Sequence, residues 1–308
     1  GQFALIAGAA GVGKSSLLDE FAGREGVPPL VGSCLPLGEH GVPFAPIVEI
    51  LRSMESDPRH AAFFPAGLGS LEPANSAGAP EPASRVQLFQ SVLALLARLA
   101  RSGSTVLVIE DIHWADRSTR DLLSFLIPNL RSEPLLVIMT YRTEDVHRDH
   151  PLRPTLAELQ RNPSVEHFDV LPFDRGLAAA HIANLTGAQP ASALVDAVMQ
   201  RTEGNPYFIE ELAAANAFAG DTLPTSLREL LLVRADVLSA DARRTLRILA
   251  LAASQVDDRS LALVAQRPLD EVREHVREAI DRRLLVQTPT GTRFAHALLR
   301  EVLQDDLL

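Results

Sequence analysis

The sequence predicts an α/β fold in which helices cover both faces of a mostly parallel sheet, followed by two smaller domains. Two observations carry this prediction. Over residues 1–172, short apolar runs bounded by turn residues alternate with stretches of helical apolar spacing. After Phe173 the strand signals give way to helical patterns. We therefore expect an α/β domain over 1–172, a small helical domain over 173–220 and a third domain over 221–308.

The apolar runs of the first domain are predicted to be buried parallel strands. They cover residues 3–7, 30–33, 105–109, 135–140 and 165–171. The clearest helix covers 85–101, where apolar residues repeat on one face and Gly103 follows as a C-cap. Further helices are expected at 15–21 and 121–130. The segment 57–84 is rich in proline, glycine and alanine without periodicity, which predicts a mobile surface insert.

The remaining elements are predicted to be helical, with one hairpin near the end. Helices are expected at 175–187, 191–202 and 207–219, and then at 226–237, 241–253, 259–265 and 269–281. Two short strands, 284–287 and 292–294, flank a Thr-Pro-Thr-Gly turn, and a last helix begins near His296. Helices closed by a short hairpin suggest a winged-helix domain over 221–308. The chain starts on a strand and stops within a helical pattern, so we expect it to be part of a longer protein.

Composition excludes several classes of protein. The 29 basic residues against 39 acidic residues leave a net charge of −10, which argues against a non-specific grip on nucleic acid. No apolar run reaches the roughly 18 residues that span a bilayer, so we expect a cytoplasmic protein. The one cysteine, Cys34, rules out an internal disulfide and is expected to be a small buried side chain.

Residues 8–15 match the phosphate-binding pattern G-x-x-x-x-G-K-[ST] in full. Glycines allow successive backbone N–H groups to face phosphate oxygens, and the following helix adds its positive dipole end. Lys14, the one lysine of the chain, would reach the β- and γ-phosphates, and the Ser15 hydroxyl would coordinate Mg²⁺. An accidental Gly/Ala-rich turn is disfavoured because an apolar strand precedes the motif and a helix follows it. The predicted nucleotide-binding residues here are Gly8, Gly11, Val12, Gly13, Lys14, Ser15 and Ser16.

A second set of polar residues follows the strand at 105–109. Glu110 and Asp111 end this strand, at the same sheet edge that presents the phosphate loop. One carboxylate would hold Mg²⁺ and the other would orient the attacking water. By position Glu110 is the metal-side residue, together with Ser15, and Asp111 the water-side residue. The sequence leaves open which of the two serves the metal, and an ordinary solvated acid pair is the alternative.

The segment Glu110–Asp116 resembles the Walker B segment of STAND-class P-loop ATPases, which are related to AAA+ proteins. It is most similar to the large ATP-binding regulators of the LuxR family, of the maltose-activator kind, although Glu110 stands where that group often has Asp. The resemblance implies that Arg142, at the end of the next strand, is a catalytic residue that senses the γ-phosphate. His113 and Trp114 are interpreted as packing or hydrogen-bonding residues.

Two later segments extend the resemblance. Gly204-Asn205-Pro206 is similar to the Gly-x-Pro element of the helical lid, which implies that Pro206 packs near the adenine. The segment from Phe294 resembles the closing motif of the winged-helix domain, which implies that His296 contacts the β-phosphate of ADP. Ala297 departs from the related His-Asp motif.

The resemblance implies a P-loop NTPase fold and an ATP/ADP switch with Mg²⁺ as cofactor. ATP would bind between the α/β domain and the lid and be hydrolysed slowly, and its state would control domain arrangement in a transcriptional regulator. The partners implied are a small-molecule or protein inducer, DNA through a domain outside this chain, and further copies on activation. An adenine-contacting segment would precede residue 1, and no membrane partner is expected.

Three alternatives remain at this point. The switch could hold ADP without useful turnover, or the same ATPase module could serve a cyclase or kinase output domain. An AAA+ ATPase of the origin-recognition or clamp-loader kind would need a basic DNA surface. The 13 arginines against 14 acidic residues after position 220 disfavour it.

Overall fold

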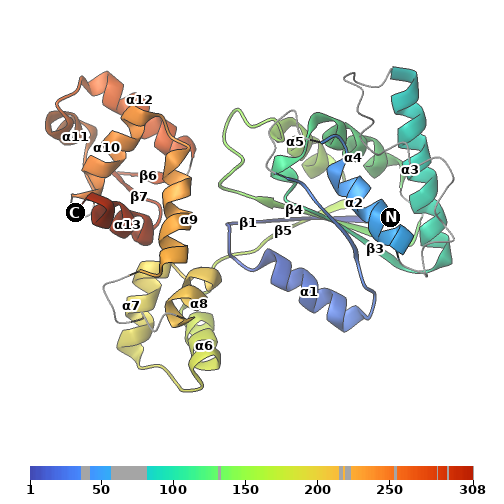
Figure 1. Ribbon diagram of the computed structural model, residues 1–308, viewed down its shortest axis with the longest axis horizontal. Coiled ribbons are helices and arrows are strands. Elements are labelled where there is room, and N and C mark those ends of the chain that lie inside the picture. The colour runs from blue at the N-terminus through green and yellow to red at the C-terminus, as the bar shows by residue number, and fades with distance from the viewer. Residues whose placement is uncertain are drawn as a thin grey trace. The chain divides into compact units, whose positions relative to one another are not determined.

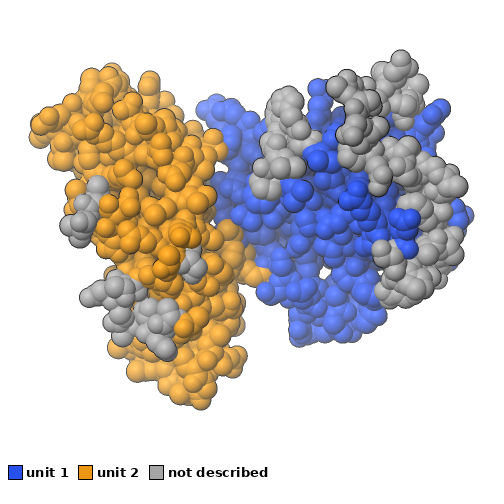
Figure 2. Space-filling view, viewed as in Figure 1, with its two compact units in different colours: residues 1–9, 14–170 blue, residues 10–13, 171–308 orange. Residues whose placement is uncertain are grey.

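The computed structural model describes residues 1–35, 42–56, 82–130, 133–214, 218, 223–252, 255–282, 284–289 and 291–307. The chain divides into two compact units, coloured in Figure 2. The first comprises Gly1–Ala9 and Lys14–Val170, and the second comprises Ala10–Gly13 and Leu171–Leu308. The predicted insert 57–84 lies outside the described residues except for 82–84, which belong to a helix and not to a loop.

The first unit contains a five-stranded sheet in which every neighbouring pair is parallel. The strand order is β2-β3-β4-β1-β5, so β4 separates the strand before the phosphate loop from the strand that ends in acids. The strands are β1 (Gln2–Gly8), β2 (Leu30–Ser33), β3 (Thr105–Glu110), β4 (Leu135–Arg142) and β5 (Val165–Asp169). The five predicted apolar runs are therefore confirmed as strands, although β5 ends two residues earlier than expected.

Helices cover both faces of this sheet, as the sequence predicts (Figure 1). Alternate strand residues face opposite sides of the sheet. Ile6, Val108 and Ile138 pack with Leu18 of one helix, whereas Phe3 and the strand residues on its side of the sheet pack with the remaining helices. The helix on the Ile6 side is α1 (Lys14–Glu25). On the other side lie α2 (Ala45–Ser56), α3 (Pro82–Ser102), α4 (Arg117–Asn129) and α5 (Arg153–Arg161). This is the architecture of a P-loop NTPase.

Two of these helices are absent from the sequence prediction. Residues 45–56 form α2, which packs into the same hydrophobic cluster as β1 and β3. Residues 153–161 form α5, a helix of 9 residues with a proline in its first turn. Its buried residues Leu156 and Leu159 lie on one face, so the apolar signal of a helix is present but spans only 9 residues. A short 3₁₀ helix, Ile112–Trp114, follows β3 directly.

In the described residues of the second unit, the secondary structure consists of helices, one hairpin and an isolated bridge between Val256 and Thr292. Its first three helices, α6 (Arg175–Thr186), α7 (Ser192–Thr202) and α8 (Pro206–Ala214), share a hydrophobic cluster of Ala178, Ile182, Val198 and Ile209. The later elements surround a second cluster. They are α9 (Thr225–Asp236), α10 (Ala240–Ala250), α11 (Asp258–Ala265), α12 (Leu269–Asp281), β6 (Leu285–Thr288), β7 (Gly291–Phe294) and α13 (Ala297–Leu307).

The antiparallel hairpin β6–β7 stands at the predicted place, and α10 ends three residues earlier than predicted. The predicted division of this region at residue 220 and its interpretation as a lid and a winged-helix domain stay predictions. Within the described ranges, none of the helices combines the length and the apolarity needed to cross a membrane.

Candidate functional site

The phosphate loop joins the end of β1 at Gly8 to the start of α1 at Lys14. Gly11 (φ 73°) and Gly13 (φ 100°) both adopt backbone conformations that side chains disfavour. A Cβ on Gly11 would also lie 2.6 Å from the Tyr207 Cβ, whereas a Cβ on Gly13 would meet nothing within 4 Å. Val12 is buried and Ser16 is exposed. The loop therefore needs Gly11 for two reasons and Gly13 for one.

Lys14 is a buried cation whose ammonium is held by the loop itself. Only 9% of the residue is exposed, and Nζ donates hydrogen bonds to the carbonyl oxygens of Gly8 and Ala9, both at 2.9 Å. Burial lowers the pKa of Lys14, while the carboxylates of Glu144, Asp111 and Asp145 act in the opposite direction. A buried ammonium is stabilised by anionic partners, so this position is suited to a phosphate group.

The two acids after β3 have different partners. Glu110 Oε1 accepts a hydrogen bond from the Ser15 hydroxyl at 2.9 Å, which joins residues 95 positions apart. A carboxylate beside a hydroxyl is a set of hard oxygen donors, which fits Mg²⁺. Among the described residues no group of three or more His, Cys, Asp and Glu side chains could hold a metal by itself. Such a donor pair suits a cation that takes its other ligands from phosphate and water.

Asp111 points to other partners. Its backbone is left-handed (φ 55°), and its N–H donates to Thr140 Oγ1 at 3.0 Å. Its carboxylate lies 3.5 Å from Arg142 Nη2. Thr140, a buried residue at the end of an apolar strand, is a positioning residue that the sequence analysis missed. The signal was a polar residue at the end of that run.

Arg142 ends β4, where its register partner is Gly8 of β1. Its guanidinium carbon lies 4.8 Å from the centroid of the Trp114 ring, in a cation–π contact. Its backbone N–H donates to His113 Nδ1 at 3.4 Å. Trp114 is thus a platform for the predicted sensor arginine as well as a packing residue.

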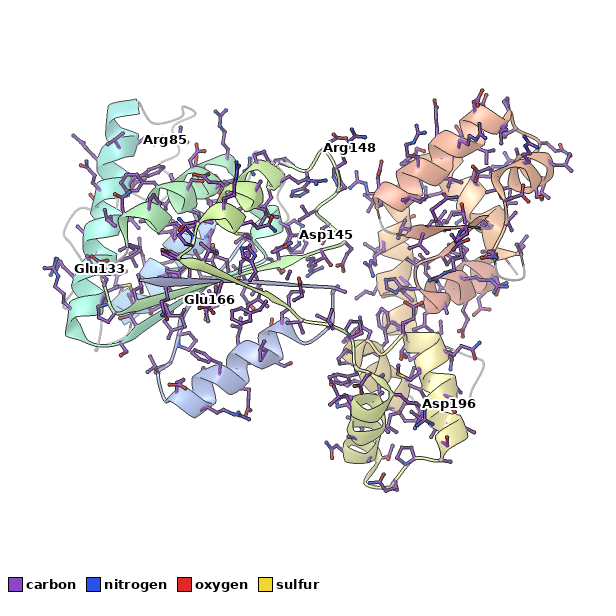
Figure 3. The ribbon with its side chains drawn as sticks, turned by 180° about the vertical axis from the view of Figure 1, so that it is seen from behind. Arg85, Glu133, Asp145, Arg148, Glu166 and Asp196 are labelled. Atoms are coloured by element: carbon purple, nitrogen blue, oxygen red, sulfur yellow. The ribbon has the colours of Figure 1, made fainter. Side chains whose placement is uncertain are left out.

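His113 is fully enclosed beside these groups. Its Nε2 lies 3.1 Å from Asp145 Oδ2, a close contact that is not aligned as a hydrogen bond. Asp145 stands in the loop after β4, where Figure 3 labels it. His113 and the backbone of Arg142 therefore support one another at the edge of the sheet, in keeping with the interpretation of His113 as a packing and hydrogen-bonding residue.

Cys34 directly follows β2 and is buried, as predicted. Burial raises the pKa of its thiol to about 12, with further increases from the nearby carboxylates of Asp116 and Asp111. A thiol that stays protonated at neutral pH is a packing group and not a nucleophile.

The predicted residues of the later segments belong to the second unit. Pro206 is the buried first residue of α8. His296 stands just before α13, and its Nδ1 lies 3.2 Å from Glu203 Oε2. Gly204 is left-handed (φ 78°), and a Cβ there would lie 2.1 Å from the Phe173 carbonyl oxygen. The Gly-x-Pro break is therefore dictated by backbone geometry.

Asn205 and Glu203 are further polar residues of this turn that the sequence analysis did not assign. Asn205 Nδ2 donates to the Ala10 carbonyl oxygen at 2.9 Å, and its Oδ1 accepts from the Tyr207 N–H at 3.1 Å. All of these groups lie in the second unit, which includes Ala10–Gly13 of the phosphate loop. The only sequence signal was the position of Asn205 between the glycine and the proline.

Comparison with known proteins gives a family match over part of the chain. Residues 1–138 match the family described as the AAA ATPase domain. An uncharacterized protein of Rhizobium meliloti (strain 1021) is 26% identical over 241 residues, which is 69% of this chain but only 22% of that protein. The chain thus corresponds to less than a quarter of this longer relative.

Solved structures show the fold. A Walker-type ATPase of Pyrococcus abyssi superposes with a TM-score of 0.59 at 17% identity, covering 98% of this chain and 91% of that one. A STAND protein with a tetratricopeptide repeat sensor from Pyrococcus horikoshii gives a TM-score of 0.43 at 14% identity, covering 99% and 40%. The second score is too low to carry an argument. The match over residues 1–138 and the P-loop fold support ATPase activity for this chain.

Proposed function

We propose that this ATPase is a signal-transduction switch of the STAND class, the nucleotide-binding core of a LuxR-type transcriptional regulator. The observation that carries the nucleotide part is that the Lys14 ammonium, bound to the Gly8 carbonyl oxygen, and the Ser15–Glu110 pair lie at one edge of the sheet. The regulator part rests on the similarity of residues 110–116, 204–206 and 294–301 to that family.

The residues present fit the chemistry of phosphoryl transfer. Lys14 and the loop N–H groups would bind phosphate oxygens, and Ser15 with Glu110 would hold Mg²⁺. When bound, Mg²⁺ supplies positive charge that offsets the charge developing on the phosphates. Asp111 would accept a proton from, or orient, the attacking water, and Arg142 would stabilise the γ-phosphate oxygens.

The proposal assigns 173–220 to a helical lid and 221–308 to a winged-helix domain. Pro206 would pack near the adenine, and His296 would bind the β-phosphate of ADP. The contact of His296 with Glu203 supports a switching role. The Glu203 carboxylate lies beside the imidazole, in the place that the phosphate of the nucleotide would otherwise take. We further propose that the protein responds to an inducer, acts on DNA through another domain, self-associates with ATP and is located in the cytoplasm.

The test is the nucleotide released when purified protein is denatured. Wild type is expected to release ADP or ATP in near-stoichiometric amounts, and Lys14→Ala is expected to release little. Arg24→Ala is the matched control, because it removes an exposed cation of the same helix, which pairs with Glu20. A wild type without nucleotide, which also binds none when ADP or ATP is added with Mg²⁺, would refute the proposal.

Turnover separates the switch from its nearest alternative. Phosphate release by wild type under excess ATP indicates a slow ATPase, whereas stoichiometric ADP without turnover indicates an ADP-holding switch. A transcription-type output is tested separately, by asking whether the longer protein carries a DNA-binding domain or a cyclase or kinase domain.

A further inference from the structure

The middle of the phosphate loop has its own anchor in the second unit. Residues Ala10–Gly13 group with Leu171–Leu308 and not with the sheet. Two backbone carbonyl groups of this stretch accept hydrogen bonds from residues at the start of α8. Asn205 Nδ2 donates to the Ala10 oxygen at 2.9 Å, and the Tyr207 N–H donates to the Gly11 oxygen at 3.2 Å.

Asn205 is well placed to hold this contact. The residue is only 5% exposed, and both polar atoms of its side chain are used. Its Oδ1 accepts the Tyr207 N–H, which fixes the amide so that Nδ2 faces the Ala10 carbonyl. The Asn205 N–H in turn donates to the Thr202 carbonyl, which fixes the backbone of the residue. Asn205 is therefore rigid before any ligand binds.

Holding a carbonyl also orients the next amide of the chain. In a trans peptide the C=O and the following N–H lie in one plane and point in opposite directions, and the structure contains no cis peptide among its described residues. The bond to the Ala10 carbonyl therefore turns the Gly11 N–H away from Asn205. The bond to the Gly11 carbonyl does the same for the Val12 N–H. Successive N–H groups turned to one side are what an anion requires.

We propose that Asn205 is a positioning residue for the nucleotide phosphates, which it serves by fixing the peptide planes at Ala10–Gly11 and, through Tyr207, at Gly11–Val12. This inference rests on the proposed binding of nucleotide by the loop. Asn205 itself touches no phosphate in this scheme. It pre-organises the N–H donors, so that binding does not have to order them.

The test compares Asn205→Ser with Thr202→Val in the otherwise unchanged chain. Serine can still cap α8 by accepting the Tyr207 N–H, but it is too short to reach the Ala10 carbonyl. Thr202→Val removes a buried hydroxyl from the same turn, which bonds to the Val198 carbonyl and the Gly204 N–H and has no bond to the loop. Affinities for ADP and for pyrophosphate are measured by calorimetry, and Tm by thermal unfolding.

Asn205→Ser is expected to weaken ADP and pyrophosphate by a similar factor of about ten, since a lost buried hydrogen bond changes an equilibrium by roughly that amount. Thr202→Val is expected to lower Tm without changing either affinity. If Asn205→Ser does not fold, Asn205→Asp serves in its place, because it keeps the cap and loses only the donor to Ala10.

Unchanged affinities in a folded Asn205 variant, with wild type binding normally, would overturn this inference and leave the proposed function intact. An equal loss of affinity in Thr202→Val would also overturn it, because the effect would then come from the stability of the turn. A wild type that binds neither ADP nor pyrophosphate would overturn both proposals.

Discussion

The carboxyl edge of the sheet in the first unit and the turn 202–207 in the second hold their polar groups by different means. At the sheet edge, the carboxylates of the two acids contact other side chains: Glu110 bonds to Ser15, and Asp111 lies beside Arg142. In the turn, the backbone is the main partner, since Asn205 and Thr202 both bond to main-chain groups. The first arrangement depends on residue types, and the second on backbone conformation.

This difference explains why the two regions were not equally visible in the sequence. A strand followed by two acids predicts its partners by chemistry alone, because Mg²⁺ and phosphate require particular side chains. A turn that presents peptide groups can be built from many residue types. Its glycine and proline were recognised, but the role of Asn205 depends on how the loop at Ala10 folds back toward it.

The largest expected effect is on hydrolysis at the sheet edge. Asp111→Asn is expected to lower ATP turnover by about 10²- to 10⁴-fold, because a group that accepts a proton or orients water contributes rate factors of this size. ADP affinity is expected to stay within a few-fold of wild type. The measurement is phosphate release at saturating ATP, with ADP binding measured in parallel.

Glu110→Gln answers the question that the sequence left open. If Glu110 serves the metal, this variant will need a higher Mg²⁺ concentration for half-maximal turnover, and Asp111→Asn will not. The opposite pattern would assign the metal to Asp111. Because Gln keeps an oxygen for the Ser15 hydroxyl, the comparison isolates the charge from the hydrogen bond.

The next effect distinguishes two glycines of one loop. Gly11→Ala combines an unfavourable φ with a contact of 2.6 Å to the Tyr207 Cβ, whereas Gly13→Ala carries the unfavourable φ alone. A left-handed conformation costs a residue with a Cβ about 1–2 kcal/mol, so Gly13→Ala is expected to lose that amount. Gly11→Ala is expected to lose more, since backbone must shift as well. Unfolding free energies of the two variants would show this, and equal losses would argue against the packing of residue 207 on the loop.

The fold was predictable where burial on both sheet faces produced apolar runs. The strands β3 and β4 read as continuous Val, Leu and Ile because α1 covers one face and α2–α5 the other. The short helix α5 was missed although Leu156 and Leu159 lie on one buried face, because 9 residues give few repeats of that pattern. The left-handed backbone at Asp111, which directs that carboxylate toward Arg142, has no sequence signature either, since Asp is common in ordinary turns.

A further effect, of similar size, concerns acid stability near the sheet edge. Burial, together with the neighbouring His147, His113 and Arg120, lowers the pKa of His150 to about 4, against the opposing charge of Asp145. The unfolded state, with a pKa near 6.5, binds the proton first, so stability falls as pH drops from about 6.5 to about 4.

In wild type, His150 Nδ1 accepts a hydrogen bond from the Leu152 N–H. His150→Asn removes the titratable imidazole but keeps an acceptor for this N–H. The variant is expected to retain about 2 kcal/mol more of its neutral-pH stability at pH 4 than wild type does. Denaturant unfolding at pH 7 and pH 4 measures the difference. His167→Asn, at an exposed position of β5, is the control and is expected to follow wild type.

The smallest expected effect is the coupling of α7 to α13 in the second unit. Arg201 Nη2 lies 2.8 Å from Glu301 Oε1, and both side chains are partly shielded from solvent. A pair of this kind is stronger than an exposed one, but its desolvation has a cost. A double-mutant cycle with Arg201→Gln and Glu301→Gln is therefore expected to give a coupling energy of about 1 kcal/mol.

This pair and the His296–Glu203 contact join the same two regions, the end of α7 and the start of α13. If the switch releases that contact, adding ATP should reduce the Arg201–Glu301 coupling, whereas ADP should not. A coupling that stays the same with either nucleotide would mean that α7 and α13 move as one body, and the switching motion would then have to lie elsewhere in the chain.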